Sequence, residues 1–331
     1  MLQTGRLRIV IPGGSGQVGR LLAAHFQERG HHVTVLTRGP YSAPWQTVHW
    51  DGEHEGQWTE HLEHADVCIN LAGRSVNCRY NQANREAIYH SRIATTQLLG
   101  RVIAALADPP AVWLNASTAT IYRHALDRPQ DRAMDEFTGE FGGHEAISAH
   151  RRAPDTWNFS IRVAMDWEAA FFSAFTPQTR KVALRSAVIM SPTPGGPFAL
   201  LLRLVQLSLG GTQGNGRQFV SWIHGLDFAR AVEFLIDRAD IDGPVNIAAP
   251  NPLPNREFMT ALREAWGMPN GIPAPAPLLE LAALVLCTES ELVLKSRRVV
   301  PARLLQAGFD FEFPTWPDAA EDLVQQWRRR P

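Results

Sequence analysis

The chain has 331 residues, of which 45% are hydrophobic and 20% charged, and its 32 basic side chains nearly balance 33 acidic ones. This length suffices for one large domain or two modest ones, each with a buried core. The net charge of −1 offers no positive field to a phosphate backbone, so no nucleic-acid partner is expected. Three widely spaced cysteines and the lack of a long apolar stretch predict a soluble cytoplasmic protein without disulfides or a membrane partner.

The first 120 residues alternate between short apolar runs rich in β-branched side chains and helical patterns. Strands are predicted over residues 7–11, 32–36, 67–71 and 111–115, and helices over residues 17–29 and 83–106. A helix over 166–175 and a strand over 181–190 continue the alternation. Because alternating strands and helices form a parallel sheet covered on both faces, the fold class is predicted as α/β, a Rossmann-type doubly wound parallel sheet.

The pattern changes after residue 190. A stretch with proline and glycine precedes an apolar helix, the glycine-rich turn GGTQGNG and a strand predicted over QFVSWIH. Helices over 228–237, 256–266 and 278–286, a strand over 245–248 and a proline-rich linker over 269–277 follow. The sequence therefore predicts a first domain over residues 1–190, completed by parts of 224–248, and a smaller C-terminal α/β domain over residues 191–331.

A glycine-rich turn with the spacing G-x-x-G-x-x-G follows the first predicted strand. Its residues are Gly13, Gly14, Ser15, Gly16, Gln17, Val18 and Gly19. In dinucleotide sites such glycines permit the tight turn, the approach of a pyrophosphate and close packing of helix on strand. The helix that begins there adds backbone amides and the positive end of its dipole. Because strand, turn, helix and second strand all occur at the expected distances, a dinucleotide site is favoured over a purely structural turn.

The residues at two strand ends bear on which dinucleotide binds. NAD sites usually place Asp or Glu at the end of the second strand, but here Thr37 and Arg38 stand there. A guanidinium binds the 2′-phosphate of NADP(H) that a carboxylate would repel, so NADP(H) is the expected cofactor, with a solvated surface arginine as the alternative. At the next strand end, Leu71, Ala72 and Gly73 let the backbone pass close to the adenosine half, unless they form a simple turn.

Further motifs extend over nearly the whole chain. They are GHHVTVLTR, ADVCINLAGRSV, the Ser91-Arg92 pair, DWEAA at 166–170, GNGRQFVSWIH at 214–224, GPVNIAAPNPLPNREF at 243–258 and RVVPARLLQAGFDF at 298–311. Together with the glycine turn they resemble extended short-chain dehydrogenase/reductases, and more narrowly an atypical NAD-dependent epimerase/dehydratase-like family. The resemblance implies an NADP(H)-binding Rossmann domain and a cleft for a small-molecule substrate beside the C-terminal domain. Extended members often pair through a four-helix interface, so a homodimer is compatible with the resemblance.

The catalytic pair of that superfamily, Y-x-x-x-K, is missing here. In the superfamily the tyrosine transfers a proton, while the lysine lowers its pKa and holds the nicotinamide ribose. The tyrosines stand at 41, 80, 89 and 122, and none has a lysine four residues further on. Alignment on Trp167-Glu168 puts Ser160 and Ala164 at the positions of the pair, and neither replaces a lysine-activated phenol. The atypical family shares this departure.

The third catalytic position of the superfamily, a Ser or Thr, is better preserved. The resemblance matches it to Thr118, whose hydroxyl would orient a substrate carbonyl beside the nicotinamide, with Ala116 along the cofactor and Ser117 and Tyr122 as neighbours. The alternative is that these hydroxyls satisfy backbone groups at the strand end. Without a nearby cation, the pKa of Tyr122, about 10, would leave it a poor acid near neutrality.

The substrate side departs from the nucleotide-sugar enzymes. Those enzymes hold the diphosphate with an arginine just before the strand that ends in Ile-His, and here Val220 stands at that position. Arg217 lies three residues earlier, where strand geometry directs it elsewhere. The aromatic residues Phe198, Phe219 and Trp222 favour a smaller, more apolar carbonyl, imine or ene compound, unless these rings belong to the core.

Residues 123–152 form a polar, irregular stretch that the resemblance places over the nicotinamide end. They are expected as a lid, or as a solvated loop that carries His124, His144 and His150. These histidines lack the spacing of metal ligands, so no metal is expected.

Two functions stay open. The first is an NADP(H)-dependent oxidoreductase that works mainly by positioning its substrate. The second is a non-catalytic NADP(H)-binding sensor or partner-binding module. A nucleotide-sugar epimerase or dehydratase is disfavoured, because both the catalytic pair and the diphosphate arginine are missing.

Overall fold

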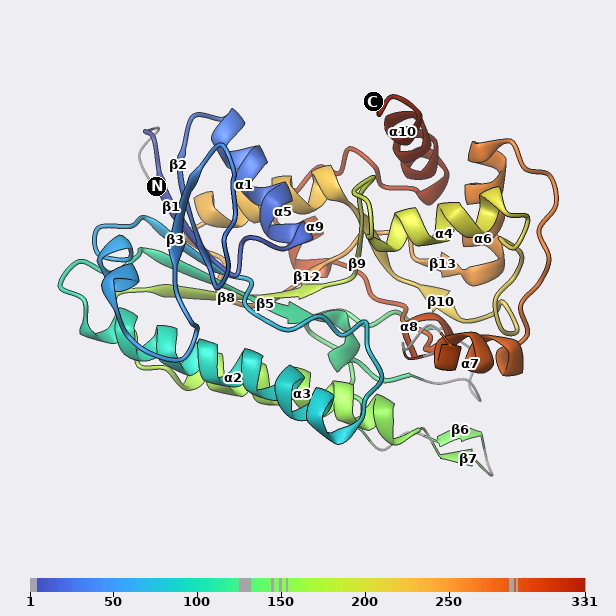
Figure 1. Cartoon of the computed structure of the whole chain (residues 1–331), viewed down its shortest axis with the longest axis horizontal. Helices are drawn as coiled ribbons and strands as arrows, with labels where there is room; N and C mark the ends of the chain where they lie inside the picture. The colour runs from blue at the N-terminus through green and yellow to red at the C-terminus, as the bar shows by residue number, and fades with distance from the viewer. Residues whose placement is uncertain are drawn as a thin grey trace.

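A computed structural model describes residues 5–124, 132–143, 146–148, 151–152, 154–285, 289 and 291–330. In this described part, seven strands form one parallel sheet in the order β12-β8-β5-β4-β1-β2-β3 (Figure 1). The strands are β1 (Arg8–Pro12), β2 (His32–Thr37), β3 (Gln46–His49), β4 (Val67–Asn70), β5 (Val112–Thr118), β8 (Arg180–Ser186) and β12 (Gly243–Ile247). The predicted doubly wound α/β fold is confirmed. The strand order reverses between β1 and β4, and such a reversal opens a crevice at the carboxyl ends of the strands.

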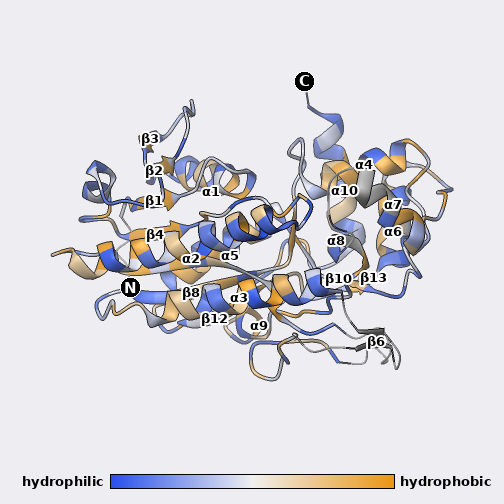
Figure 2. Ribbon diagram, turned by 60° about the horizontal axis from the view of Figure 1, so that its bottom comes forward, coloured by the Kyte–Doolittle hydropathy of each residue, from blue (hydrophilic) through white to orange (hydrophobic). Residues whose placement is uncertain are grey.

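Helices cover both faces of the sheet (Figure 1). Helices α1 (Gln17–Glu28) and α5 (Gly225–Asp237) lie on one face, and α2 (Gln82–Ala105) and α3 (Asp155–Ser173) on the other. Alternate strand residues face opposite sides, so Ile9 and Ile11 join the core under α1 and α5, while Val10 joins the core under α2 and α3. Figure 2 shows apolar strands β1, β2 and β4 beside helices that carry both polar and apolar residues.

Helix α3 begins at Asp155, well before the predicted start at residue 166. Its first two turns bury Trp157, Phe159, Ile161 and Val163. That two-residue alternation is typical of a strand, and the helical period becomes visible only from Ala164 onwards. Here tertiary packing against α2 decides the structure rather than the local pattern.

The C-terminal part contains a second apolar core. It lies between helices α4 (Pro197–Gln206), α6 (Asn255–Trp266) and α10 (Trp316–Arg328), where the rings of Phe258 and Trp316 stack 3.9 Å apart. The predicted strand at 218–224 is split: β10 (Phe219–Val220) pairs with β13 (Leu253–Pro254), and β11 (Trp222–His224) pairs with β9 (Val188–Met190). Short helices α7 (Ala276–Val285), α8 (Glu291–Leu294) and α9 (Ala302–Gln306) follow. No described helix is both long and apolar enough to cross a membrane.

A buried ion network ties α3 to the middle of the sheet. Glu168 on α3 accepts two hydrogen bonds from Arg185 on β8, at 2.8 and 2.7 Å, and a third from the Ser117 hydroxyl at 2.6 Å. Arg185 also donates to the Tyr122 hydroxyl at 2.9 Å, which donates in turn to Asn246 Oδ1 on β12 at 2.9 Å. The network therefore joins one helix and three strands, and each buried charge in it has a partner.

Replacing Glu168 by alanine is expected to lower the free energy of unfolding by about 3–5 kcal/mol, because it leaves Arg185 buried without its carboxylate. Chemical denaturation followed by tryptophan fluorescence measures the change. The exposed Glu60 provides the control, and Glu60→Ala should change the free energy by no more than about 0.5 kcal/mol. Equal unfolding midpoints for the two variants would contradict the structural role of the network.

Candidate functional site

The glycine turn after β1 makes a backbone cradle at the reversal of the sheet. Gly13 has φ +74°, and a Cβ there would lie 2.6 Å from the Ala72 Cα. A Cβ at Gly19 would lie 2.3 Å from the Gly14 Cα, so helix α1 packs directly on the turn. Gly16 precedes α1 without a capping side chain, and a Cβ there would meet no atom closer than 3.8 Å. The open side of the turn and the amides of the helix N-terminus fit a pyrophosphate.

The other residues of the turn and the end of β2 surround this cradle. The Thr37 hydroxyl lies 3.1 Å from the Ser15 hydroxyl, which joins the end of β2 to the turn. Arg38 is exposed at the same edge, where a 2′-phosphate would lie next to the turn. The Gln17 amide donates to Ser191 Oγ at 2.8 Å, so this side chain reaches toward the C-terminal part rather than toward the cradle.

The loop after β4 forms the opposite wall of the cradle. Its shape is set by Asn70, whose amide donates to Asn115 at 2.7 Å and whose oxygen accepts from the Ala72 amide at 3.0 Å. The Leu71 amide donates to the Pro12 carbonyl at 2.9 Å, which holds the loop against β1. A buried polar network therefore fixes the backbone of residues 71–73 beside the glycine turn.

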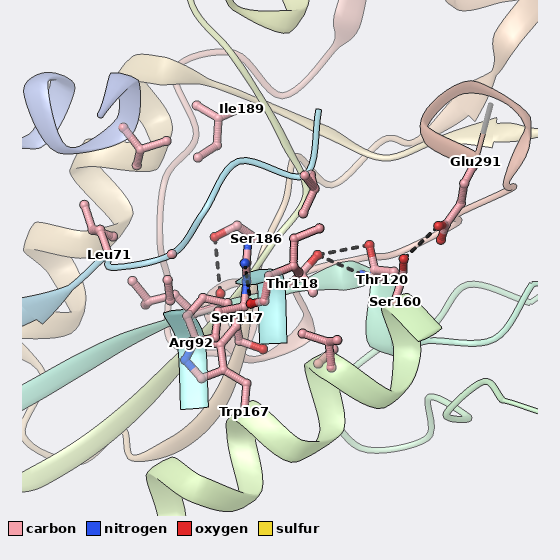
Figure 3. A pocket seen from close by; sticks show the side chains of 18 of the residues that line it. Leu71, Arg92, Ser117, Thr118, Thr120, Ser160, Trp167, Ser186, Ile189 and Glu291 are labelled. Carbon is pink, nitrogen blue, oxygen red and sulfur yellow. Dashed lines mark hydrogen bonds between the residues drawn. The ribbon is translucent and has the colours of Figure 1, made fainter. Parts of the chain in front are cut away.

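A cleft of about 290 Å³ continues from this cradle toward the C-terminal part (Figure 3). Its near end is lined by residues of the predicted cofactor site, namely Val18, Leu71, Gly73 and Ala116. Ser160 and Ala164, which the alignment on Trp167-Glu168 predicts at the positions of the missing pair, line the same cleft as Thr118. In Figure 3 Thr118 stands between Arg92 on one side and Ser160 and Glu291 on the other.

The three hydroxyls proposed from the sequence have different surroundings. Thr118 accepts a hydrogen bond from the Thr120 amide at 3.2 Å and faces the cleft. Ser117 also lines the cleft, but its hydroxyl donates to buried Glu168. Tyr122 does not line the cleft and is fully buried, and burial raises its pKa. The sequence pattern showed no cation near Tyr122, but the structure places Arg185 there, and Arg185 donates a hydrogen bond to the Tyr122 hydroxyl. Tyr122 therefore belongs to the buried ion network and does not donate a proton to a ligand.

A polar cluster that the sequence did not indicate closes the far end of the cleft. The Ser160 hydroxyl donates to Glu291 at 2.7 Å, and Glu291 also contacts Arg297 at 3.3 Å and buried Lys295 at 3.4 Å. Burial, and then the charge of Glu291, raise the pKa of Tyr80 to about 12, while a hydrogen bond with Ser160 acts in the opposite direction. Tyr80 therefore stays protonated as a hydrogen-bond donor next to Ser160.

Comparisons with known proteins place the chain in a family. The sequence profile of the NAD dependent epimerase/dehydratase family matches residues 9–248, and that of a domain of unknown function, DUF1731, matches residues 274–323. The chain belongs to the NAD dependent epimerase/dehydratase family. The epimerase family protein SDR39U1 of Bos taurus is 30% identical over 326 residues, which are 96% of this chain and 100% of the relative. The epimerase family protein Mb2239 of Mycobacterium bovis is 31% identical over 315 residues, 94% of this chain and 95% of the relative.

Solved structures of this family are similar in fold. The crystal structure of human SDR39U1 (isoform 2) with NADPH has a TM-score of 0.82 and 28% identity, and the match covers 96% of this chain and 99% of that one. A nucleoside-diphosphate sugar epimerase from Corynebacterium glutamicum has a TM-score of 0.72 and 29% identity over 98% of this chain and 61% of that one. Within our chain the epimerase/dehydratase segment supplies Tyr80, Arg92 and Ser160 to the cleft, and the DUF1731 segment supplies Glu291 and Arg297.

The residues that the sequence analysis assigned to the substrate side lie away from the cleft. Val220 belongs to β10 and packs against the C-terminal core, and Arg217 is exposed. Phe198 and Trp222 are fully buried in the same core, and Phe219 does not line the cleft either. The expectation that these rings surround a substrate was wrong. Phe198 and Trp222 are core residues, which was the alternative expectation.

His124 was expected in a solvated loop, and this is also wrong. It is 1% exposed, its ring centre lies 4.5 Å from that of Trp157, and its Nδ1 accepts from the Ser296 amide at 2.7 Å. Burial lowers its pKa to about 3. The neutral ring thus docks the segment that carries Glu291 and Arg297 onto the rest of the site. His144 and His150 lie outside the described residues.

This low pKa predicts a loss of stability in acid. In the unfolded chain His124 is protonated near pH 6.5, whereas in the folded protein it stays neutral until about pH 3. The contribution of the neutral ring to the free energy of unfolding is therefore fully present above pH 6.5 and is lost as the pH falls below it. When the pH falls from 7.5 to 5, the free energy of unfolding of the parent should decrease by about 2 kcal/mol more than that of His124→Asn. Urea unfolding measures both changes. The exposed His49 provides the control, since His49→Asn should follow the parent. Identical losses in the parent and in His124→Asn would contradict the prediction.

Proposed function

We propose that the protein binds NADPH at the glycine turn and reduces a small, largely apolar carbonyl, imine or ene compound in the adjoining cleft. The observation that carries this proposal is the continuity of the cleft, which begins at the dinucleotide cradle and passes Thr118 before it reaches Tyr80 and Ser160. The NADPH in the human SDR39U1 structure supports the choice of cofactor. When bound, NADPH supplies a hydride from its nicotinamide ring.

The cofactor would be held by groups already in place. The backbone around Gly13 and Gly16 and the N-terminus of α1 would bind the pyrophosphate, while Arg38 would bind the 2′-phosphate. The loop at residues 71–73 and Ala116 would line the path toward Thr118.

Within the cleft, hydroxyl groups would orient the substrate. Thr118 and Tyr80 line the space from different elements, and the raised pKa of Tyr80 keeps its phenol protonated. Hydrogen bonds from these hydroxyls would stabilise negative charge that develops on the substrate during reduction. A solvent proton would complete the reduction, so that NADPH and one proton give the reduced product and NADP⁺. Positioning would carry most of the rate enhancement, because the sequence contains no Y-x-x-x-K pair.

The preference for NADPH over NADH should depend on Arg38. In the parent we expect NADPH to bind at least about tenfold more tightly, since a guanidinium adds charge-assisted hydrogen bonds to the 2′-phosphate. Arg38→Ala should bring the two affinities close together, as measured by quenching of tryptophan fluorescence. Arg101→Ala, at an exposed position of α2, is the control and should keep the preference. Equal affinities in the parent would refute the proposed cofactor site.

Turnover should depend on the Thr118 hydroxyl. In stopped-flow oxidation of bound NADPH by ketones, imines and activated alkenes, Thr118→Val should lower the rate at least about tenfold with unchanged NADPH affinity. Thr47→Val, at an exposed position of β3, is the control and should match the parent. Tight NADPH binding without turnover of any compound would contradict the oxidoreductase and favour the NADPH-binding sensor.

A further inference from the structure

Helix α2 brings one arginine to the dinucleotide end of the cleft. A Cβ at Gly73 would lie 3.3 Å from Cζ and 3.5 Å from Nη1 of Arg92, so the guanidinium packs directly on the backbone of the loop after β4. Arg92 lines the same cleft as Thr118. Figure 3 shows Arg92 on the side of Thr118 away from Ser160 and Glu291. The guanidinium therefore lies where the cleft leads from the cradle to the Thr118 hydroxyl.

Most of the donors of Arg92 are unused. Its Nη1 donates to the Ile88 carbonyl at 3.0 Å, whereas its Nε and Nη2 bind no group of the described residues. Neither of these two nitrogens is closed off from solvent, in contrast to the Nε of Arg297. Burial lowers the pKa of Arg92 to about 10, which leaves it charged at neutral pH. The side chain thus presents free N–H donors to the cleft.

An aromatic ring of α3 also holds the guanidinium. The centre of the Trp167 ring lies 5.2 Å from Cζ of Arg92, and the ring quadrupole attracts a cation at this distance. The indole nitrogen of Trp167 donates to the Thr96 hydroxyl at 2.9 Å, which fixes the ring. Contacts with Gly73, Ile88 and Trp167 therefore hold the guanidinium in place before any ligand binds. A donor that is fixed in advance loses little conformational freedom when it binds a ligand.

The order of groups along a dinucleotide indicates what Arg92 would meet. If the phosphates lie on the glycine turn and the nicotinamide ring lies next to Thr118, the ribose that joins them lies in the part of the cleft that Arg92 lines. That ribose carries two neighbouring hydroxyl groups, whose oxygens accept hydrogen bonds. The Nε and Nη2 of a guanidinium lie on one edge of a planar fork, so they can donate to two neighbouring oxygens.

We propose that Arg92 binds the hydroxyl groups of the nicotinamide ribose and thereby positions the nicotinamide ring beside Thr118. This inference rests on the proposed function and adds a residue to its cofactor site. Arg92 thus supplies, from α2, a cation for the ribose that the lysine of Y-x-x-x-K supplies elsewhere in the superfamily. The glycine at position 73 has a matching role, because a side chain there would crowd the guanidinium.

Isothermal titration with three ligands of increasing length tests the proposal. They are 2′-phospho-ADP, which ends at the pyrophosphate, 2′-phospho-ADP-ribose, which adds the ribose, and NADPH, which adds the nicotinamide. Arg92→Gln should weaken the two ribose-containing ligands about tenfold or more, because hydrogen bonds from a charged donor are lost, and 2′-phospho-ADP less than about threefold. Arg92→Lys should retain part of the affinity for both ribose-containing ligands. Arg101→Gln, at an exposed position of α2, is the control and should bind all three like the parent.

Three results would overturn the proposal. An equal loss for all three ligands would assign Arg92 to the pyrophosphate or to the support of the loop after β4. A loss for NADPH alone would assign Arg92 to the nicotinamide ring, and unchanged binding of all three ligands would leave it no role in the cofactor site. A parent that does not bind NADPH would refute the proposed function itself, whereas NADPH binding that depends on Arg38 but not on Arg92 would refute only the role of Arg92.

Discussion

The close approach of two backbone segments at the reversal of the sheet determines the layout of the whole site. Gly13 passes so near Ala72 that a side chain at residue 13 would collide with the neighbouring loop. The buried side chain of Asn70 holds that loop in place, because its amide donates to Asn115 and its oxygen accepts from the Ala72 amide. Because both segments are fixed by the ends of adjacent parallel strands, the crevice between them has a defined shape before any ligand enters. The cleft toward the C-terminal part begins at this crevice.

Neighbouring hydroxyl groups at the end of β5 serve different purposes. Ser117 and Tyr122 join Arg185 and Glu168 in the buried network, where they satisfy charges that hold α3 to the sheet. Ser117 and Thr118 both line the cleft, but the Ser117 hydroxyl is bound to Glu168, whereas Thr118 has no place in that network. One short segment therefore supplies both groups of the buried network and a hydroxyl that faces the cleft. The stability of α3 and the position of Ser160 in the cleft thus depend on the same network.

The features that the sequence predicted are those with local causes. The strands of the sheet are short apolar runs rich in β-branched residues, and the glycine turn follows from steric limits that act within seven residues. The start of α3 was missed because Trp157, Phe159 and Ile161 mimic the alternation of a strand. The cluster of Tyr80, Ser160 and Glu291 could not be predicted, since tertiary folding brings together groups from distant parts of the chain.

We propose that the crevice at the sheet reversal and the cleft behind it form one continuous site for a dinucleotide and its substrate. A crystal structure of the protein with NADPH tests this claim most directly. We expect the adenosine phosphate beside Arg38, the pyrophosphate on the glycine turn and the nicotinamide ring next to Thr118, with its reactive face toward Tyr80. A nicotinamide bound outside the cleft, or phosphates bound away from the glycine turn, would contradict a continuous site.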